Sequence, residues 1–485
     1  MLERKLFDFK HTYQSLPQSF FKKVNPSAVS NPKLVFWNEE LAKQLKIDPA
    51  ALDKEELAEL FVGNQLFKDS EPIAQAYAGH QFGNFTMLGD GRAILLGEHV
   101  LKNNSVLDIQ LKGAGITPFS RGGDGRGTLS SMLRELIMSE TLHQLNIPTS
   151  RGLAVVSTGD QVYRQTVEMG GILTRVATSH LRVGTFEYAR RFLDQNALEQ
   201  LLDYALERHY PSGLASENRA KALLEFVMDK QIQLIVNWMR VGFIHGVMNT
   251  DNFTISGETI DYGPCAFMNA YFPGTVFSSI DRQGRYAYGN QPAIGQWNLS
   301  CLAGALLPLF HENEKIAIDM AEQLLNKYPE KFKTEHALML ARKVGFETSN
   351  EEIARFVSLF LQFLEKHRID FTNAFLYLES STYQSYVQHH EDWEMIKGKW
   401  KELLKSNNIS EEQAIAIMQK NNPTIIPRNH NVEKALLEVS KKNEFTFFKS
   451  FMAQLKDPYS RSDRPVEFML PPEGGDAGYK TYCGT

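Results

Sequence analysis

The feature that most constrains the fold is a change in hydrophobic periodicity near residue 190. Before this point, short runs of alternating apolar and polar residues are separated by glycine-rich turns, a pattern typical of half-buried strands. The run LDIQLKGAG at 107–115 is a clear example and places Lys112 near the end of its strand. After residue 190, apolar residues recur at helical spacing. The sequence therefore predicts an α+β fold with a β-rich part followed by a helical part.

The β-rich part is predicted to be a mixed sheet that carries one helix. Two apolar runs that flank GDGR at 89–92 are predicted to be strands joined by a turn there. A helix is expected over 130–145 and a hairpin over 153–167, with its turn at Thr158-Gly159-Asp160. Near the N-terminus, Asn38 is expected to cap a short helix.

The helical part begins with DKQIQLIVNWMRVGF at 229–243. Its apolar residues fall at i, i+3, i+4 and i+7, which predicts a buried stripe of Ile232, Ile235, Val236 and Met239. The last 25 residues are rich in Pro, Gly and Asp and are expected to form a loose tail. The predicted domains are an N-terminal extension (1–60), a β-rich lobe (61–185), a helical lobe with a metal-binding loop (186–300), a further helical region (301–460) and the tail (461–485).

Composition narrows the possible partners. The net charge of -5 over 485 residues offers no basic excess for binding nucleic acid. The only cysteines are Cys265, Cys301 and Cys483, which do not form a disulfide framework and favour a reducing compartment. The first 20 residues lack a signal-peptide pattern, and the apolar stretch 232–244 is too short and too polar to span a bilayer. We expect a soluble, cytoplasmic protein with no nucleic-acid or membrane partner.

The segment from His245 to Gly263 carries the strongest chemical signal. In a kinase catalytic loop, an Asn follows the His by seven residues, and a metal-binding Asp in a DFG-like turn comes later. Here Asn252 and the Asp261-Tyr262-Gly263 turn occupy these positions. Mg²⁺ prefers oxygen ligands, so both side chains are predicted to bind a metal. A short strand, FTI at 253–255, is expected between them, and His245 is expected to be structural.

One position departs from the kinase pattern. The residue two after the His is Val247 rather than Asp, and a valine cannot accept a hydroxyl proton. Asp251, next to Asn252, is the candidate base from a shifted position. This assignment requires that the reacting phosphate also lies elsewhere than in a conventional kinase.

Other residue types suit the binding of a polyphosphate. Lys112 is the candidate phosphate-binding lysine, and Glu135 on the following helix is its candidate ion-pair partner. Glycines permit close approach of the backbone to phosphate, and arginines supply positive charge. The remaining candidates are Gly89, Gly91 and Arg92 in GDGR, Asp124 and Gly125 in a second glycine-rich loop, and Arg175 and Arg182 downstream.

These blocks resemble the selenoprotein O family of YdiU-type pseudokinases. The resemblance rests on GDGR, LDIQLKGAG, PFSRGGDGR at 118–126, RELIMSE at 134–140, HGVMNTDN and IDYGP, and it continues through GRYAYGNQPAIGQWNL at 284–299 to Cys483. It implies a protein-kinase-like two-lobe fold that binds ATP in a flipped orientation. The implied activity is transfer of AMP to Ser, Thr or Tyr hydroxyls of proteins with Mg²⁺ or Mn²⁺ and release of pyrophosphate; transfer of UMP from UTP is also attributed to bacterial members.

By residue match, the resemblance implies that Asp251 is the proton acceptor and that Asn252 and Asp261 hold the metal. It also implies that Glu135 pairs with Lys112. The implied nucleotide-binding residues are Gly89, Gly91, Arg92, Lys112, Asp124, Gly125, Arg175, Arg182 and Asp261.

Two alternatives remain open at this point. The HG…N pattern also resembles that of aminoglycoside-type phosphotransferases, so a conventional kinase is possible, although Val247 speaks against it. The second alternative is a catalytically inactive pseudokinase that binds ATP as a scaffold. The family resemblance also implies a redox role for Cys483, with a disulfide to another cysteine as one form of it, but the spacing of Cys265 and Cys301 identifies no partner.

Overall fold

A nine-stranded antiparallel sheet forms the N-terminal half of the computed structural model, which describes residues 5–48, 52–380, 382–383 and 390–482. The strands follow the order β2-β4-β7-β8-β11-β10-β3, and β1 and β9 pair with β7 and β11. Their bounds are β1 Phe9–Lys10, β2 Phe21–Lys23, β3 Lys33–Trp37, β4 Ile73–Gln75, β7 Ala93–Val100, β8 Val106–Lys112, β9 Gly127–Thr128, β10 Arg151–Tyr163 and β11 Val167–Ala177. The predicted α+β class and the strand that ends at Lys112 are confirmed.

Successive side chains along each strand point to opposite faces of the sheet, so buried apolar residues form one cluster on each face. On β7, Leu95 faces one cluster of buried side chains, whereas Ile94 and Leu96 face the other. The first face is covered by α3 (Leu129–Gln144). The second face is covered by α1 (Glu39–Leu45) and α2 (Lys54–Val62), which pack against β10.

The first 60 residues are part of this sheet. β1, β2 and β3 all come from this segment and pair with β7, β4 and β10. The predicted cap is confirmed, because the Asn38 side chain accepts a hydrogen bond of 3.1 Å from the backbone N–H of Leu41. No break in the sheet coincides with the predicted boundary at residue 60.

Two turns differ from the prediction. β10 does not end at Thr158-Gly159-Asp160; it continues to Tyr163, and these three residues form a bulge opposite Gly170, with Gly159 at φ 79°. The GDGR segment also does not join two paired strands. β6 (Asn84–Met87) pairs with β5 (Ala78–Gln81) in a separate hairpin, and β7 enters the large sheet. Glycine at positive φ suits a bulge as well as a turn, so the local sequence did not distinguish them.

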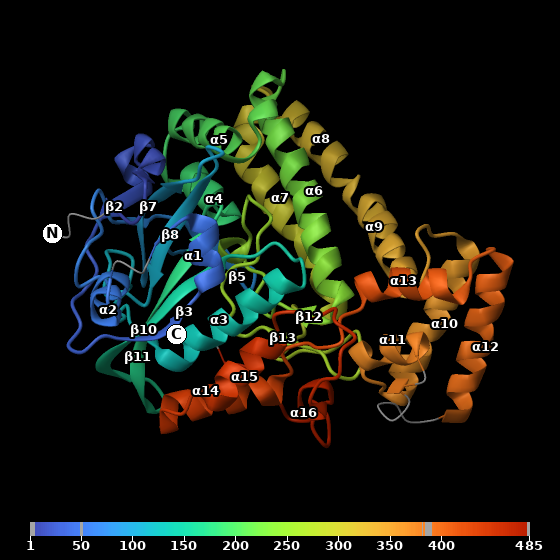
Figure 1. Ribbon diagram of the computed structural model, residues 1–485. Helices are drawn as coiled ribbons and strands as arrows, with labels where there is room; N and C mark the ends of the chain where they lie inside the picture. Colours follow the sequence, from blue (N-terminus) through green and yellow to red (C-terminus); the bar gives the residue numbers. More distant parts are fainter. Residues whose placement is uncertain (1–4, 49–51, 381, 384–389, 483–485) are drawn as a thin grey trace.

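The rest of the chain is mainly helical, as predicted (Figure 1). Figure 1 shows α6–α9 beside the sheet, α10–α13 at the far end of the molecule and α14 and α15 below α3. The bounds are α4 Val183–Phe192, α5 Gln195–His209, α6 Arg219–Arg240, α7 Gln291–Phe310, α8 Glu314–Leu325, α9 Tyr328–Lys343, α10 Glu351–His367, α11 Phe371–Glu379, α12 His390–Ser406, α13 Glu411–Asn421, α14 Asn429–Lys442, α15 Thr446–Gln454 and α16 Val466–Met469. A two-stranded pair, β12 (Phe243–Ile244) and β13 (Ala266–Phe267), follows α6.

Two of the long helices form the centre of the helical part. The predicted stripe on α6 is confirmed, because Ile232, Ile235, Val236 and Met239 are all buried. Within the described chain, one segment, Tyr288–Phe310, is long and apolar enough to cross a membrane by length and composition. Half of its most apolar window is buried, and α7 packs against α4, α6 and α8, as a core helix does.

The C-terminal tail is not loose over its described residues, contrary to the prediction. Asp476 accepts hydrogen bonds from the backbone and the side chain of Asn269, at 2.9 and 2.7 Å. Thr481 donates its hydroxyl to the carbonyl of Pro264, and its backbone N–H bonds the carbonyl of Phe277. Polar side chains of the tail thus satisfy backbone groups of the helical lobe. Cys483 lies outside the described residues.

Candidate active site

A large cavity lies where the sheet, α3 and the helical part of the chain meet. Its volume is about 1450 Å³. Its lining contains every residue that the sequence singled out for catalysis, metal or nucleotide: Gly89, Gly91, Arg92, Lys112, Asp124, Gly125, Glu135, Arg175, Arg182, Asp251, Asn252 and Asp261. The structure therefore brings the predicted site residues together. Their individual roles remain predictions.

Lys112 and Arg175 enter the cavity from neighbouring strands. Lys112 on β8 lies opposite Leu173 on β11, and Arg175 follows two residues later on the same face. The Lys112 Nζ donates to Glu135 on α3 at 2.6 Å and to Asp261 at 2.7 Å. Arg175 also bonds both of these carboxylates. The predicted Lys112–Glu135 ion pair is therefore present.

Asp261 is the point where the cations of the cavity converge. Lys112, Arg175 and Arg182 all pair with its carboxylate, the last at 3.3 Å. Burial alone would raise the pKa of Asp261, but the positive charges of Arg175, Lys112 and Arg182 outweigh it and hold the pKa well below its usual range. Asp261 is therefore an anion at neutral pH, as a carboxylate that binds a metal must be.

Asp251 lies in a short 3-10 turn, Thr250–Asn252, and is buried. Burial raises its pKa to about 6, although the positive charge of Arg182 opposes this shift. Its Oδ1 has no hydrogen-bond partner among the described residues, and its Oδ2 accepts a long hydrogen bond, 3.5 Å, from Gln81 Nε2. Asp251 lines the cavity, and a buried carboxylate that makes few hydrogen bonds suits a proton acceptor.

Asn252 is oriented by the residue that departs from the kinase pattern. Its Nδ2 donates to the carbonyl of Val247 at 3.0 Å, which leaves its amide oxygen as the available ligand atom. An amide oxygen and the ionised carboxylate of Asp261 are the hard oxygen donors that Mg²⁺ and Mn²⁺ accept. The donor set therefore fits the predicted divalent metal.

The segment between these two residues differs from the prediction. FTI at 253–255 does not form a strand; Thr254 makes only one bridge, with Arg182. Instead, the Thr254 hydroxyl donates to the carbonyl of Glu258 and accepts from its N–H, which closes a loop. His245 is buried beneath this loop and bonds the carbonyl of Ile260 at 2.9 Å, consistent with the expected structural role.

The β5–β6 hairpin contacts the turn at 249–252, which carries Asp251. Sequence reasoning missed this contact. The backbone N–H of His80 donates to the Thr250 hydroxyl at 2.7 Å, and that of Phe82 donates to the Asn249 side chain at 3.1 Å. A Cβ at Gly79 would lie 2.9 Å from Oδ1 of Asp251. In the sequence, Gly79 and Gly83 flank His80-Gln81-Phe82. These glycines were the only local sign that another part of the backbone approaches here.

The two glycine-rich segments are shaped by backbone contacts. A Cβ at Gly91 would lie 2.9 Å from the carbonyl of Phe119, and one at Gly125 would lie 2.0 Å from that of Gly115. Asp124 lines the cavity but is held by Arg164 at 2.8 Å, and its hydrogen bonds with Arg164 lower its pKa. Sequence reasoning also missed Asp90, which is buried and lies 3.7 Å from Arg182.

The chain is similar to known proteins along nearly its whole length. A family model described as "Protein adenylyltransferase SelO" matches residues 4–456. A "Protein nucleotidyltransferase YdiU" from Anoxybacillus flavithermus is 49% identical over 479 residues, which cover 99% of both chains. Proteins of the same name from Geobacillus kaustophilus and Pelagibacter ubique are 48% and 46% identical, over 98% of this chain and 99% of theirs.

Proposed function

Since the chain belongs to the SelO family of protein adenylyltransferases and is thus a nucleotidyltransferase enzyme, we propose that it transfers AMP from ATP to Ser, Thr or Tyr hydroxyls of proteins. The observation that carries this proposal is the position of Asp251. It is a buried carboxylate beside the Asp261 cation cluster, whereas the position of a conventional kinase base holds Val247. A base at a shifted position suits a bound ATP in which the α-phosphate, rather than the γ-phosphate, lies next to the acceptor hydroxyl.

The proposal includes a protein-kinase-like two-lobe fold. Support comes from the pairing of a strand lysine, Lys112, with a helix glutamate, Glu135, and from the Asp261-Tyr262-Gly263 turn beside them. The β-rich part and the helical part contribute to one cavity, as the two lobes of a kinase do.

In this proposal, Asn252 and Asp261 hold Mg²⁺ or Mn²⁺, which offsets the negative charge of the phosphates when bound. Lys112, Arg175 and Arg182 stabilise the charge on the α-phosphate and on the departing pyrophosphate. Asp251 accepts the hydroxyl proton, and its pKa of about 6 keeps most of it ionised at neutral pH. The new bond joins the hydroxyl oxygen to the α-phosphorus, and the bond from this phosphorus to pyrophosphate breaks.

The proposal also covers the nucleotide that donates the transferred group and the cellular compartment of the enzyme. The cation cluster binds phosphates rather than a base, so UTP is an alternative donor and UMP an alternative transferred group. The chain has only three cysteines and a net charge of only -5, which suits a cytoplasmic enzyme that acts on other proteins.

The test is incubation of the purified protein with Mg²⁺ or Mn²⁺ and ATP labelled at either the α- or the γ-phosphate. Asp251→Asn keeps the shape of the side chain but removes its basicity. Asp319→Asn, at an exposed position on α8, is the matched control. We expect covalent label on protein from α-labelled ATP only, lost in Asp251→Asn and retained in Asp319→Asn.

Other outcomes identify the alternatives. Label from the γ-phosphate only would make the protein a conventional kinase with a displaced base. Binding of ATP without label from either position would support an inactive scaffold. Full activity of Asp251→Asn would remove Asp251 from the mechanism.

A further inference from the structure

Three side chains capable of binding a metal meet outside the nucleotide cavity. They are His80 on β5, Glu187 on α4 and Cys301 on α7, and one ligand atom from each lies within 4.8 Å of the others. The side chains of His80 and Glu187 are 28% and 5% exposed, and Cys301 is half-buried. None of the three belongs to the residue set assigned to nucleotide transfer.

The packing of three elements creates this cluster. α4 packs against both β5 and α7, so it places Glu187 between the hairpin and the long core helix. Oε1 of Glu187 bonds Nδ1 of His80 at 2.5 Å. Its Oε2 is buried and has no hydrogen-bond partner among the described residues. A buried carboxylate oxygen without a partner is costly, and a bound cation would satisfy it.

The chemistry of the donors selects the type of metal. Imidazole nitrogen, thiolate sulfur and carboxylate oxygen together form a ligand set typical of Zn²⁺, whereas Mg²⁺ and Ca²⁺ take oxygen ligands. We propose that His80, Glu187 and Cys301 bind one Zn²⁺ ion, distinct from the metal of the nucleotide cavity, with a fourth position left for water or another ligand.

The surroundings also suit a neutral zinc–ligand unit. One thiolate, one carboxylate and one neutral imidazole balance the two positive charges of the ion. The Trp297 ring lies 5.4 Å from that of His80 and is covered by the Arg285 guanidinium at 4.6 Å. Zinc binds cysteine as the thiolate, so zinc binding would release the thiol proton of Cys301.

Zinc at this position would connect the hairpin to the helical lobe. The backbone N–H of His80 bonds Thr250, the neighbour of Asp251. An ion that ties His80 to α4 and α7 would hold the β5–β6 hairpin against the turn that carries Asp251. Its role is structural, so it needs no part in nucleotide transfer.

The test uses tag-free protein, stripped of metals with a chelator and then titrated with Co²⁺ in excess Mg²⁺. Mg²⁺ competes for oxygen ligands but poorly for a thiolate, and Co²⁺ gives a thiolate charge-transfer band only when sulfur is a ligand. We expect one equivalent of Co²⁺ with this band, displaced by Zn²⁺. Cys301→Ser should lose the band and lower the affinity on the order of 100-fold.

Two controls separate this site from the rest of the protein. Cys265→Ser removes another buried thiol, and Asn252→Ala removes a proposed ligand of the nucleotide metal. Both variants should keep the band and the stoichiometry. A band that persists in Cys301→Ser, or no Co²⁺ and Zn²⁺ binding by the unsubstituted protein, would overturn the proposal. Neither result depends on whether AMP is transferred.

Discussion

Gln81 is a single side chain that links the β5–β6 hairpin to the proposed base. Its Nε2 donates to Oδ2 of Asp251 at 3.5 Å, and its backbone neighbours His80 and Phe82 bond the same turn. Oδ1 of Asp251 is buried against Gly79 of the same hairpin and has no hydrogen-bond partner among the described residues. Gln81 therefore serves as a positioning residue in the proposed mechanism.

We predict that Gln81→Leu lowers kcat for AMP transfer by on the order of 10- to 100-fold, because a misplaced base transfers protons poorly. KM for ATP should change little, since among the described residues the Gln81 side chain makes no hydrogen bond with Lys112, Arg175 or Asp261. Initial rates with α-labelled ATP measure both constants. Gln195→Leu, at an exposed position on α5, is the control. An effect confined to KM would contradict the positioning role.

The ionisation of one residue, Glu258, is expected to make the stability of the folded protein depend on pH. It closes the loop between Asn252 and Asp261 and accepts hydrogen bonds from the N–H and hydroxyl of Thr178. Burial raises its pKa from 4.5 to about 7. Between these values the folded state keeps a proton that the unfolded state has lost, so this group lowers stability as pH rises through the window.

We predict that Glu258→Gln removes this dependence. The variant should gain stability relative to the unsubstituted protein as pH rises from 4.5 to 7, by roughly 1–3 kcal/mol in total. Urea unfolding at several pH values measures the difference. A difference that stays constant across the window would show that the pKa of Glu258 is not raised.

At the scale of elements, the start of α4 is fitted tightly against the hairpin. A Cβ at Gly184 would lie 2.0 Å from the carbonyl of Ala78 and 3.4 Å from Cα of Asp251. The hairpin, the turn that carries Asp251 and α4 can therefore approach one another only because this position has no side chain. The start of α4 thus lies against the backbone of both Ala78 and Asp251.

We predict that Gly184→Ala destabilises the protein by about 1–3 kcal/mol and strongly reduces AMP transfer, because backbone must move to admit the methyl group. Gly304→Ala is a matched control in a helix, since a Cβ there meets nothing within 4 Å. This control should be neutral or stabilising by up to about 1 kcal/mol. Thermal unfolding and transfer assays compare the two, and equal effects would contradict the steric argument.

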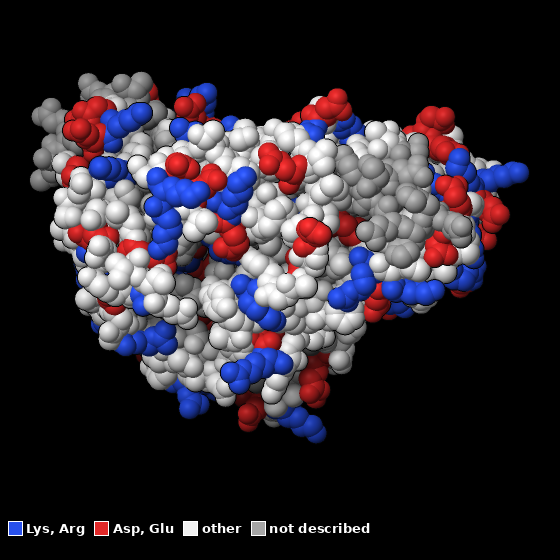
Figure 2. Space-filling model, turned by 90° about the horizontal axis from the view of Figure 1, so that it is seen from below, with Lys and Arg blue, Asp and Glu red and all other residues white. Residues whose placement is uncertain are grey.

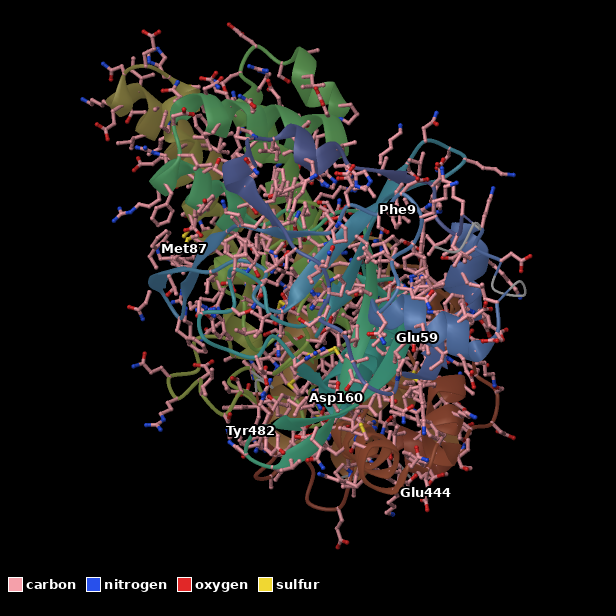
Figure 3. The ribbon with its side chains drawn as sticks, turned by 90° about the vertical axis from the view of Figure 1, so that its left-hand side faces the viewer. Phe9, Glu59, Met87, Asp160, Glu444 and Tyr482 are labelled. Carbon is pink, nitrogen blue, oxygen red and sulfur yellow. The ribbon has the colours of Figure 1, made fainter. Side chains whose placement is uncertain are left out.

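At the scale of the whole molecule, the tail and α14 complete the mouth of the cavity. The lining includes Glu433 and Leu437 of α14 as well as Tyr479 and Tyr482 of the tail. Figure 3 shows Tyr482 near the lower end of the sheet, below Asp160 on β10. Figure 2, a view from below, shows Lys and Arg interspersed with Asp and Glu on this face. The described part of the tail, up to Tyr482, thus borders the proposed nucleotide site.

We predict that Asp476→Ala releases the tail. Asp476 accepts bonds from Asn269 and, at 3.2 Å, from the side chain of Asn429. Asn429 keeps its bond to the carbonyl of Phe267, but loss of Asp476 leaves the backbone N–H and the Nδ2 of Asn269 without a partner among the described residues. Destabilisation of about 1–3 kcal/mol and faster proteolysis within the tail should follow. Glu473→Ala, at an exposed position, should have neither effect. Limited proteolysis and thermal unfolding measure both, and an unchanged cleavage rate in Asp476→Ala would contradict the docking.

The sequence by itself determined the local features of this protein. Alternation identified the strand that ends at Lys112, helical spacing identified the buried stripe of α6, and the spacing of Asn252 and Asp261 indicated a metal site. These signals are periodic or lie within a few tens of residues, so they are readable without knowledge of packing. The family resemblance then supplied the set of residues that the cavity brings together.

Only the tertiary structure decided contacts between distant segments. In the structure, Gly159 is part of a bulge rather than a turn. Gln81 of the β5–β6 hairpin contacts Asp251, and Asp476 of the tail bonds Asn269. His80 and Glu187 are separated by 107 residues, yet they bond each other. Such contacts depend on how whole elements pack, and no local pattern encodes which side chains then meet.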